Sequence, residues 1–154
     1  MIDKQIIKNK TQKKESKNLL GKNLNVIYKD VKRPIYDLDT ITVKDDVMLN
    51  NWYKKYAKEV FKKYLDEAYY VFDEKIPYPI IKVRGMKTRW GVCNRRDNSV
   101  TLNLELIKKD PMYLNYVIVH ELSHFVHFDH SKAFWGVVEK YCPDYKIVRK
   151  KLKE

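Results

Sequence analysis

The sequence is poor in cysteine and glycine and contains no long apolar run. Two cysteines in 154 residues are too few for a disulfide framework, and four glycines exclude a collagen-like repeat. The strongest apolar run, residues 116–119, ends at His120, far short of the ~20 residues that span a bilayer. The N-terminus also lacks the apolar region of a secretory signal. These absences predict no membrane association and a reducing, cytoplasmic setting.

Charge is abundant and mostly positive. The chain has 32 basic and 20 acidic residues, a formal net charge of +12, and a length suited to one domain. Residues 1–44 carry 11 basic and 5 acidic side chains, and residues 76–110 carry 8 and 3. A basic surface attracts phosphate backbones, although the same charge also suits a solvated lysine-rich surface. Weak nucleic-acid association is therefore a second hypothesis for the partners of this chain.

The first half of the chain predicts a flexible start followed by a long helix. Residues 1–18 are polar, lysine-rich and aperiodic, so we expect a flexible N-terminal segment before a domain at 19–154. From residue 47 to 72, apolar residues recur every three or four positions, which is typical of an amphipathic helix. Its predicted buried stripe comprises Tyr53, Ala57, Val60, Phe61, Tyr64, Ala68 and Phe72.

Short strand-like runs flank this helix, and further helices follow. Strands are predicted at 24–28, 41–43, 80–83, 88–93 and 100–106, the last half-buried because apolar and polar residues alternate. Asp110 before Pro111 marks a helix start, Ser131 marks another, and a short basic helix ends the chain. The predicted fold is α+β, with one small, mainly antiparallel sheet against the long helix and the histidine-bearing helix.

All four histidines lie within eleven residues. His120 and His124 are four apart on a predicted helix, so their rings share one face and can bind a single Zn²⁺. Glu121 follows the first histidine, where it can take a proton from a metal-bound water. A buried histidine is often only a packed core residue, but that interpretation does not explain this clustering. We therefore predict a hydrolytic zinc site with Glu121 as its base.

A third ligand is needed, and His130 is the best candidate. On a straight helix His130 would lie about 15 Å along the axis from His120, so the chain must turn back after Val126. His127 is the rival, but on an unbroken helix it would lie ~10 Å along the axis from His120. We predict that His120, His124 and His130 bind the metal and that His127 lies at the surface, beside the ligands or toward substrate.

Five short motifs stand out in the second half of the chain: Arg89-Trp90-Gly91-x-Cys93, Leu102-Asn103, Tyr116-Val117-Ile118-Val119-His120-Glu121-Leu122-x-His124, His130-Ser131-x-x-Phe134-Trp135 and Pro143-Asp144-Tyr145. Their combination resembles the YgjP-like metallopeptidase family, which is related to the SprT-like and minimal zincin domains. The resemblance implies a zincin-like fold, a bound Zn²⁺ held by His120, His124 and His130, Glu121 as catalytic base, and an intracellular location. This chain has Val92 where the family usually has serine.

The segment Arg89-Trp90-Gly91 is the candidate substrate-binding strand. An edge strand beside a zinc site can pair with an extended peptide, Gly91 allows close backbone approach, and Arg89 can bind a carboxylate or an oxyanion. The alternative is that Trp90 belongs to the core and Arg89 is an ordinary surface charge. Three further polar side chains are candidates to orient a ligand histidine, namely Asn103, Asp129 and Glu139.

Taken together, these features predict a zinc-dependent peptidase that uses a Glu-activated, zinc-bound water to hydrolyse peptide bonds in a peptide or protein substrate. Two alternatives stay open. One is a basic nucleic-acid-associated zinc module that acts on or near DNA-bound proteins. The other is a structural zinc domain without activity. The sequence predicts neither the oligomeric state nor the natural substrate.

Overall fold

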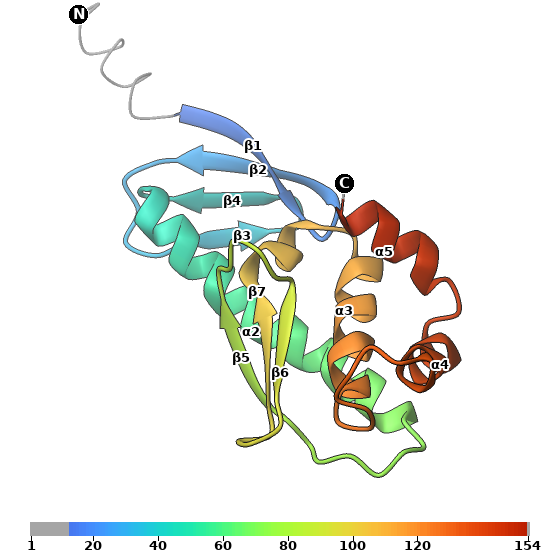
Figure 1. The fold of residues 1–154 in the computed structure, drawn as a ribbon. Coiled ribbons are helices and arrows are strands. Elements are labelled where there is room, and N and C mark those ends of the chain that lie inside the picture. Colours follow the sequence, from blue (N-terminus) through green and yellow to red (C-terminus); the bar gives the residue numbers. More distant parts are fainter. Residues whose placement is uncertain (1–12, 154) are drawn as a thin grey trace, which may run out of the picture.

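The computed structural model describes residues 13–153, and Figure 1 shows their arrangement. Two small sheets lie along one long helix, and three shorter helices complete the fold. The described residues therefore form the α+β architecture that the sequence predicts. The difference is that the strands divide between two sheets instead of one, and each sheet contains one parallel pair. None of the helices in residues 13–153 is long and apolar enough to cross a membrane.

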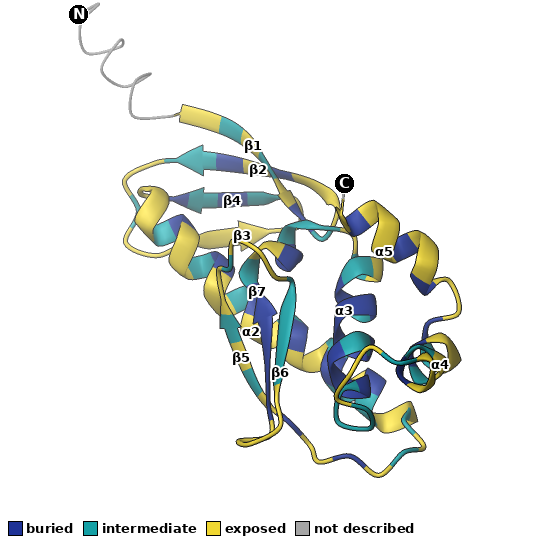
Figure 2. Ribbon diagram, in the orientation of Figure 1, coloured by how far each residue is buried: buried dark blue, intermediate teal, exposed yellow. Residues whose placement is uncertain are grey.

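The N-terminal sheet has the strand order β1-β2-β4-β3. One face of its central strands supplies the core, since Leu24, Val26, Ile41 and Val43 are fully buried. Figure 2 shows that burial concentrates in β2 and β4 and that β3 is exposed. The strands of this sheet are β1 (Lys13–Leu19), β2 (Lys22–Tyr28), β3 (Ile35–Asp37) and β4 (Thr40–Val43).

The expectation of a flexible segment over residues 1–18 needs correction. Residues 13–18 belong to β1, which pairs antiparallel with β2 from Lys13 opposite Tyr28 to Leu19 opposite Lys22. This strand lies at a sheet edge and most of its side chains are exposed, so it lacks the apolar alternation by which strands are found in sequence. Residues 1–12 lie outside the described part of the chain.

The long helix α2 (Asp46–Val71) packs against both sheets. The Asp45 side chain caps it by accepting a hydrogen bond from the Met48 amide. Its buried face is rotated from the predicted stripe, because Leu49 and Leu65 are buried whereas Val60 and Tyr64 are only half-buried. Tyr53 and Phe61 lie within the buried face as predicted, whereas Val60 and Tyr64 pack against its edge and stay partly exposed.

The second sheet has the order β5-β7-β6, with β7 at its centre. Every residue of β7 is buried, so the predicted half-buried strand is wrong on this point. The predicted strand also ends early: at Leu104 the chain turns into a short 3-10 helix, whose first turn the Asn103 side chain caps. The elements are β5 (Ile80–Arg84), β6 (Gly91–Asn94), β7 (Ser99–Asn103) and η1 (Leu104–Lys108).

The C-terminal helices are α3 (Pro111–Ser123), α4 (Lys132–Tyr141) and α5 (Tyr145–Lys153). As predicted, the Asp110 and Ser131 side chains cap α3 and α4. The turn between β1 and β2 lies close against the start of α3: Gly21 has φ +78°, and a Cβ there would lie 2.9 Å from the Cα of Asp110. This contact joins the N-terminal sheet to the histidine-bearing helix.

Candidate metal centre

Helix α3 ends inside the histidine cluster. His120 lies in its last turn, and His124 is its C-terminal cap. The amides of Val126 and His127 both donate to the Ser123 carbonyl at 3.0 Å, which turns the chain away from the helix axis. The chain then returns through an irregular segment to His130, immediately before α4. The chain therefore turns back toward His130 as predicted, but the helix already ends at Ser123, before the predicted break after Val126.

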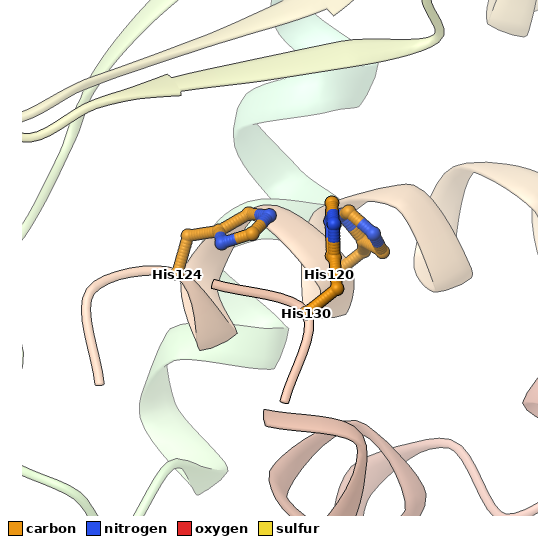
Figure 3. Close-up of side chains that lie close together, drawn as sticks. All are labelled: His120, His124 and His130. Atoms are coloured by element: carbon orange, nitrogen blue, oxygen red, sulfur yellow. The ribbon is translucent and has the colours of Figure 1, made fainter. Parts of the chain in front are cut away.

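This return brings three imidazoles together, as Figure 3 shows. One nitrogen from each of His120, His124 and His130 lies within 4.8 Å of the other two. The ring centroids are 5.0 Å apart for His120 and His124, 5.3 Å for His120 and His130, and 4.8 Å for His124 and His130. The His127 ring is not part of this group, so the structure brings together the three histidines that the sequence selected.

The Phe134 side chain packs against all three imidazole rings. This fully buried side chain of α4 contacts His120, His124 and His130 at centroid distances of 5.0, 4.5 and 5.1 Å. The His124 ring is stacked on it, with an angle of 29° between the planes. Packing against one rigid aromatic ring limits the rotamers that the imidazoles can adopt, so the cluster is largely arranged before any ligand binds.

Two of the rings are also oriented by hydrogen bonds. His124 Nδ1 lies 3.2 Å from the carbonyl oxygen of His127, and His120 Nδ1 lies 3.1 Å from Glu121 Oε1. An acceptor at Nδ1 favours the tautomer with its proton there and leaves the Nε2 lone pair free. His127 thus acts through its backbone, while the proposed orienting side chain Asn103 instead donates to the carbonyls of Met86 and Arg89.

Glu121 is buried but only half satisfied. Its side chain is about 5% exposed, and Oε2 is the buried side-chain polar atom for which the described residues provide no partner. A buried carboxylate oxygen without a partner is costly, so it is expected where a group from outside the protein completes its bonding. Three imidazole donors with an unsatisfied carboxylate beside them form a donor set that suits a divalent metal carrying a water.

Burial also sets the protonation of nearby groups. It is the main reason that the pKa of His124 lies below its ordinary value, with the nearby histidines adding to the effect and Glu121 opposing it. Folding therefore disfavours the protonated ring, so the metal-free protein loses stability as the pH falls below the unfolded pKa of about 6.5. Burial, with the Glu121 charge, raises the pKa of Cys93 to about 12, which keeps this thiol protonated near neutral pH.

The cluster opens into a cleft of about 840 Å³ between α3 and β6. Arg89 and Gly91 line it, together with Glu121 and the three histidines. Trp90 does not; it lines an adjacent cavity of about 210 Å³ on the other side of Gly91, with Lys109 Nζ 5.3 Å from the centre of its ring. Strand β6 is an edge strand of its sheet among the described residues, so its free side borders this site.

The comparisons with known proteins agree with this geometry. The model of the YgjP-like metallopeptidase domain family matches residues 3–154, almost the whole chain. The chain belongs to the YgjP-like metallopeptidase family. Membership in a metallopeptidase family implies a peptide substrate and a divalent metal. The search of curated proteins finds no match.

Two solved structures are similar to this chain. The metallopeptidase zymogen abylysin of Pyrococcus abyssi is 22% identical with a TM-score of 0.54, and the match covers 60% of this chain and 90% of abylysin. The jannalysin zymogen of Methanocaldococcus jannaschii is also 22% identical, with a TM-score of 0.46 and coverage of 60% and 96%. The abylysin likeness shows a shared zincin-like fold.

Sequence analysis missed three features of the site. The carbonyl of His127 orients a ring, but a backbone group leaves no trace in residue type. Phe134 was noted only as part of a family motif, although its position four residues after His130 places it near the cluster. Arg95 and Arg96 line the cleft from the loop after β6; their excess charge was visible, but their location was not.

Gly91 provides a test of how β6 positions the carboxylate. A Cβ there would lie 2.8 Å from Val117 Cγ1 and 2.9 Å from Glu121 Cγ, inside normal contact distance. We predict that Gly91→Ala lowers the free energy of unfolding by about 1–3 kcal/mol, because β6 must move from α3. The matched control is Gly136→Ala in α4, where a Cβ meets nothing within 4 Å and alanine should stabilise the helix by about 0.5–1 kcal/mol. Urea denaturation of both variants checks this; equal effects would contradict it.

Proposed function

We propose that this protein is a zinc-dependent peptidase in which His120, His124 and His130 hold the metal and Glu121 is the general base. The observation that carries the proposal is the convergence of three imidazole nitrogens within 4.8 Å beside a buried carboxylate with one unpartnered oxygen. The position of this group in an open cleft supports a catalytic site over a closed structural one.

The donor set favours zinc among the divalent metals. Three neutral imidazoles suit Zn²⁺, and three protein ligands leave a position for water or substrate. When bound, the metal would lower the pKa of a coordinated water toward neutrality and polarise the substrate carbonyl. The protein orients the imidazole rings in two ways. The His127 carbonyl bonds the His124 ring, and the buried Phe134 side chain packs against all three rings.

Glu121 has the geometry of a proton shuttle. Its Oε1 is held 3.1 Å from His120 Nδ1, so the carboxylate has a fixed orientation, and Oε2 is left without a protein partner. In the proposed mechanism Oε2 accepts a proton from the attacking water and then donates it to the leaving amine. The close contact with Gly91 keeps the carboxylate from turning away.

The free edge of β6 is the proposed substrate track. An extended peptide that pairs with this edge would lie along the cleft wall formed by Gly91, next to Glu121. Arg89 borders the cleft at one end of the strand, where its guanidinium can bind a substrate carboxylate or a developing oxyanion. Trp90 would contact substrate only through the adjacent cavity that it lines.

The assignment of the metal ligands predicts different results for two neighbouring histidines. His130→Ala should lower zinc affinity by at least about 100-fold, since an apparent binding free energy of roughly 10–16 kcal/mol is shared among few ligands. His127→Ala keeps the carbonyl that orients His124, so its affinity should change by less than about threefold. Competition titration with a chelator measures both. A large loss in His127→Ala with none in His130→Ala would refute the ligand set.

The assignment of the base predicts activity loss without metal loss. Glu121→Gln preserves the shape of the side chain but cannot accept the proton, so peptide hydrolysis should fall by about 10²–10⁴-fold. Zinc content, measured by elemental analysis after dialysis, should stay at one ion per chain. If Glu121→Gln hydrolyses peptides at the rate of the unmodified protein, Glu121 is not the base.

A further inference from the structure

The arginines of this protein are concentrated at the catalytic cleft. The chain has only six, among 32 basic residues. Arg89, Arg95 and Arg96 line the main cleft, and Arg89 and Arg149 line the adjacent smaller cavity. Among the lysines of residues 13–153, only Lys153 lines either space. Arginine is therefore the main basic residue around the two cavities, although lysine is the more common basic residue of the chain.

The arginines around the two cavities have no acidic partner among the described residues. None of the four forms an ion pair among residues 13–153, whereas several lysines do. Instead, two of them lie over aromatic rings: Arg95 is 5.9 Å from the centre of Phe128, and Arg149 is 4.9 Å from that of Trp135. An aromatic ring supports the face of a guanidinium and leaves its N–H donors at the edge available.

The cleft contains little negative charge of its own. Within the described part of the chain, Glu121 is the only acidic residue that lines either cavity. Asp97, in the same loop as Arg95 and Arg96, is directed to Lys82, with 3.1 Å between Oδ2 and Nζ. The positive charge around the site is thus uncompensated by neighbouring side chains, and an anionic ligand would complete it.

The arginines stand at both ends of β6. Arg89 lies two residues before Gly91, and Arg95 and Arg96 follow the strand end at Asn94. Arg89 and Arg95 are six positions apart, and four of the five residues between them form β6, so their Cα atoms are at most about 20 Å apart at ~3.3 Å per residue. In a peptide paired with β6 and cleaved opposite Gly91, a side chain about two residues from the bond would therefore lie near Arg89, and side chains about four to five residues away on the other side would lie near Arg95 and Arg96.

We propose that the cleft selects acidic peptide segments, with Asp or Glu side chains on both sides of the scissile bond bound by Arg89, Arg95, Arg96 and Arg149. This proposal rests on the proposed peptidase function and adds its substrate class. Guanidinium groups form paired hydrogen bonds with carboxylates, which lysine cannot do. A peptide is favoured over a nucleic acid because the free strand edge offers backbone pairing, and because Arg95 already occupies a face of the exposed Phe128 ring.

Binding and hydrolysis are tested separately with three peptides. They share one sequence and carry Glu, Gln or Lys at the second to fifth positions on each side of a central bond. Affinity is measured by fluorescence anisotropy on zinc-loaded Glu121→Gln protein, and kcat/KM on the zinc-loaded unmodified protein. We expect the Glu peptide to bind about tenfold more tightly than the Gln peptide and about 100-fold more tightly than the Lys peptide. The preference should shrink between about 0.05 M and about 0.5 M salt.

Two matched double variants test whether the cleft arginines cause the preference for the Glu peptide. Arg95→Gln/Arg96→Gln removes two charges from the cleft, and Arg33→Gln/Arg84→Gln removes two exposed arginines that line neither cavity. The first should reduce the preference for Glu over Gln about tenfold, and the second should leave it within about twofold. Unchanged zinc content and thermal unfolding show that both remain folded.

Different results would refute the peptidase function and the acidic-segment site. Tight, salt-sensitive binding of the Glu peptide without hydrolysis of any peptide would support the acidic-segment site and refute the peptidase function. Hydrolysis without any preference among the three peptides, or an equal loss in both double variants, would overturn the acidic-segment site. The acidic-segment site would also be overturned if the protein bound a single-stranded oligonucleotide and did not bind the Glu peptide.

Discussion

The site depends on a single structural event, the ending of α3 at Ser123. If the helix continued, His130 would lie about 15 Å along the axis from His120, and the two side chains would be too far apart to bind the same metal ion. The Ser123 carbonyl instead accepts two amides at 3.0 Å, and the chain folds back so that three imidazoles meet over Phe134. The same turn places the His127 carbonyl against His124. One local termination therefore assembles the cluster and orients one of its rings.

The second sheet packs against α3 and helps to hold Glu121 in place. The fully buried strand β7 carries β6 beside α3, and Asn103 at its end holds the segment before β6 through the carbonyls of Met86 and Arg89. Gly91 then lets β6 approach Glu121 to a distance that no other residue would permit. Packing therefore affects the chemistry of the site directly, because the Glu121 carboxylate is buried against β6 and one of its oxygens has no partner among the described residues.

Much of the site could be predicted from sequence because its signals are local. The spacing of His120, His124 and His130 fixes both a shared helix face and the need for a turn, and the caps at Asp110 and Ser131 are read from residue type. Features that depend on distant packing were harder to predict. Thr101 is buried because β7 lies at the centre of a sheet, and Leu104 leaves the strand where Asn103 caps a turn. The gathering of Arg149 from α5 with Arg89 is likewise a product of the tertiary fold.

The central claim is that three imidazoles from one broken helix and its return segment bind one zinc ion. X-ray absorption spectroscopy of the zinc-loaded protein tests it most directly, because it reports the atoms around the metal. The account predicts three imidazole nitrogens at about 2.0–2.1 Å with an additional light oxygen ligand and no sulfur. A sulfur ligand at about 2.3 Å, which would implicate Cys93, or fewer than three imidazoles would contradict it.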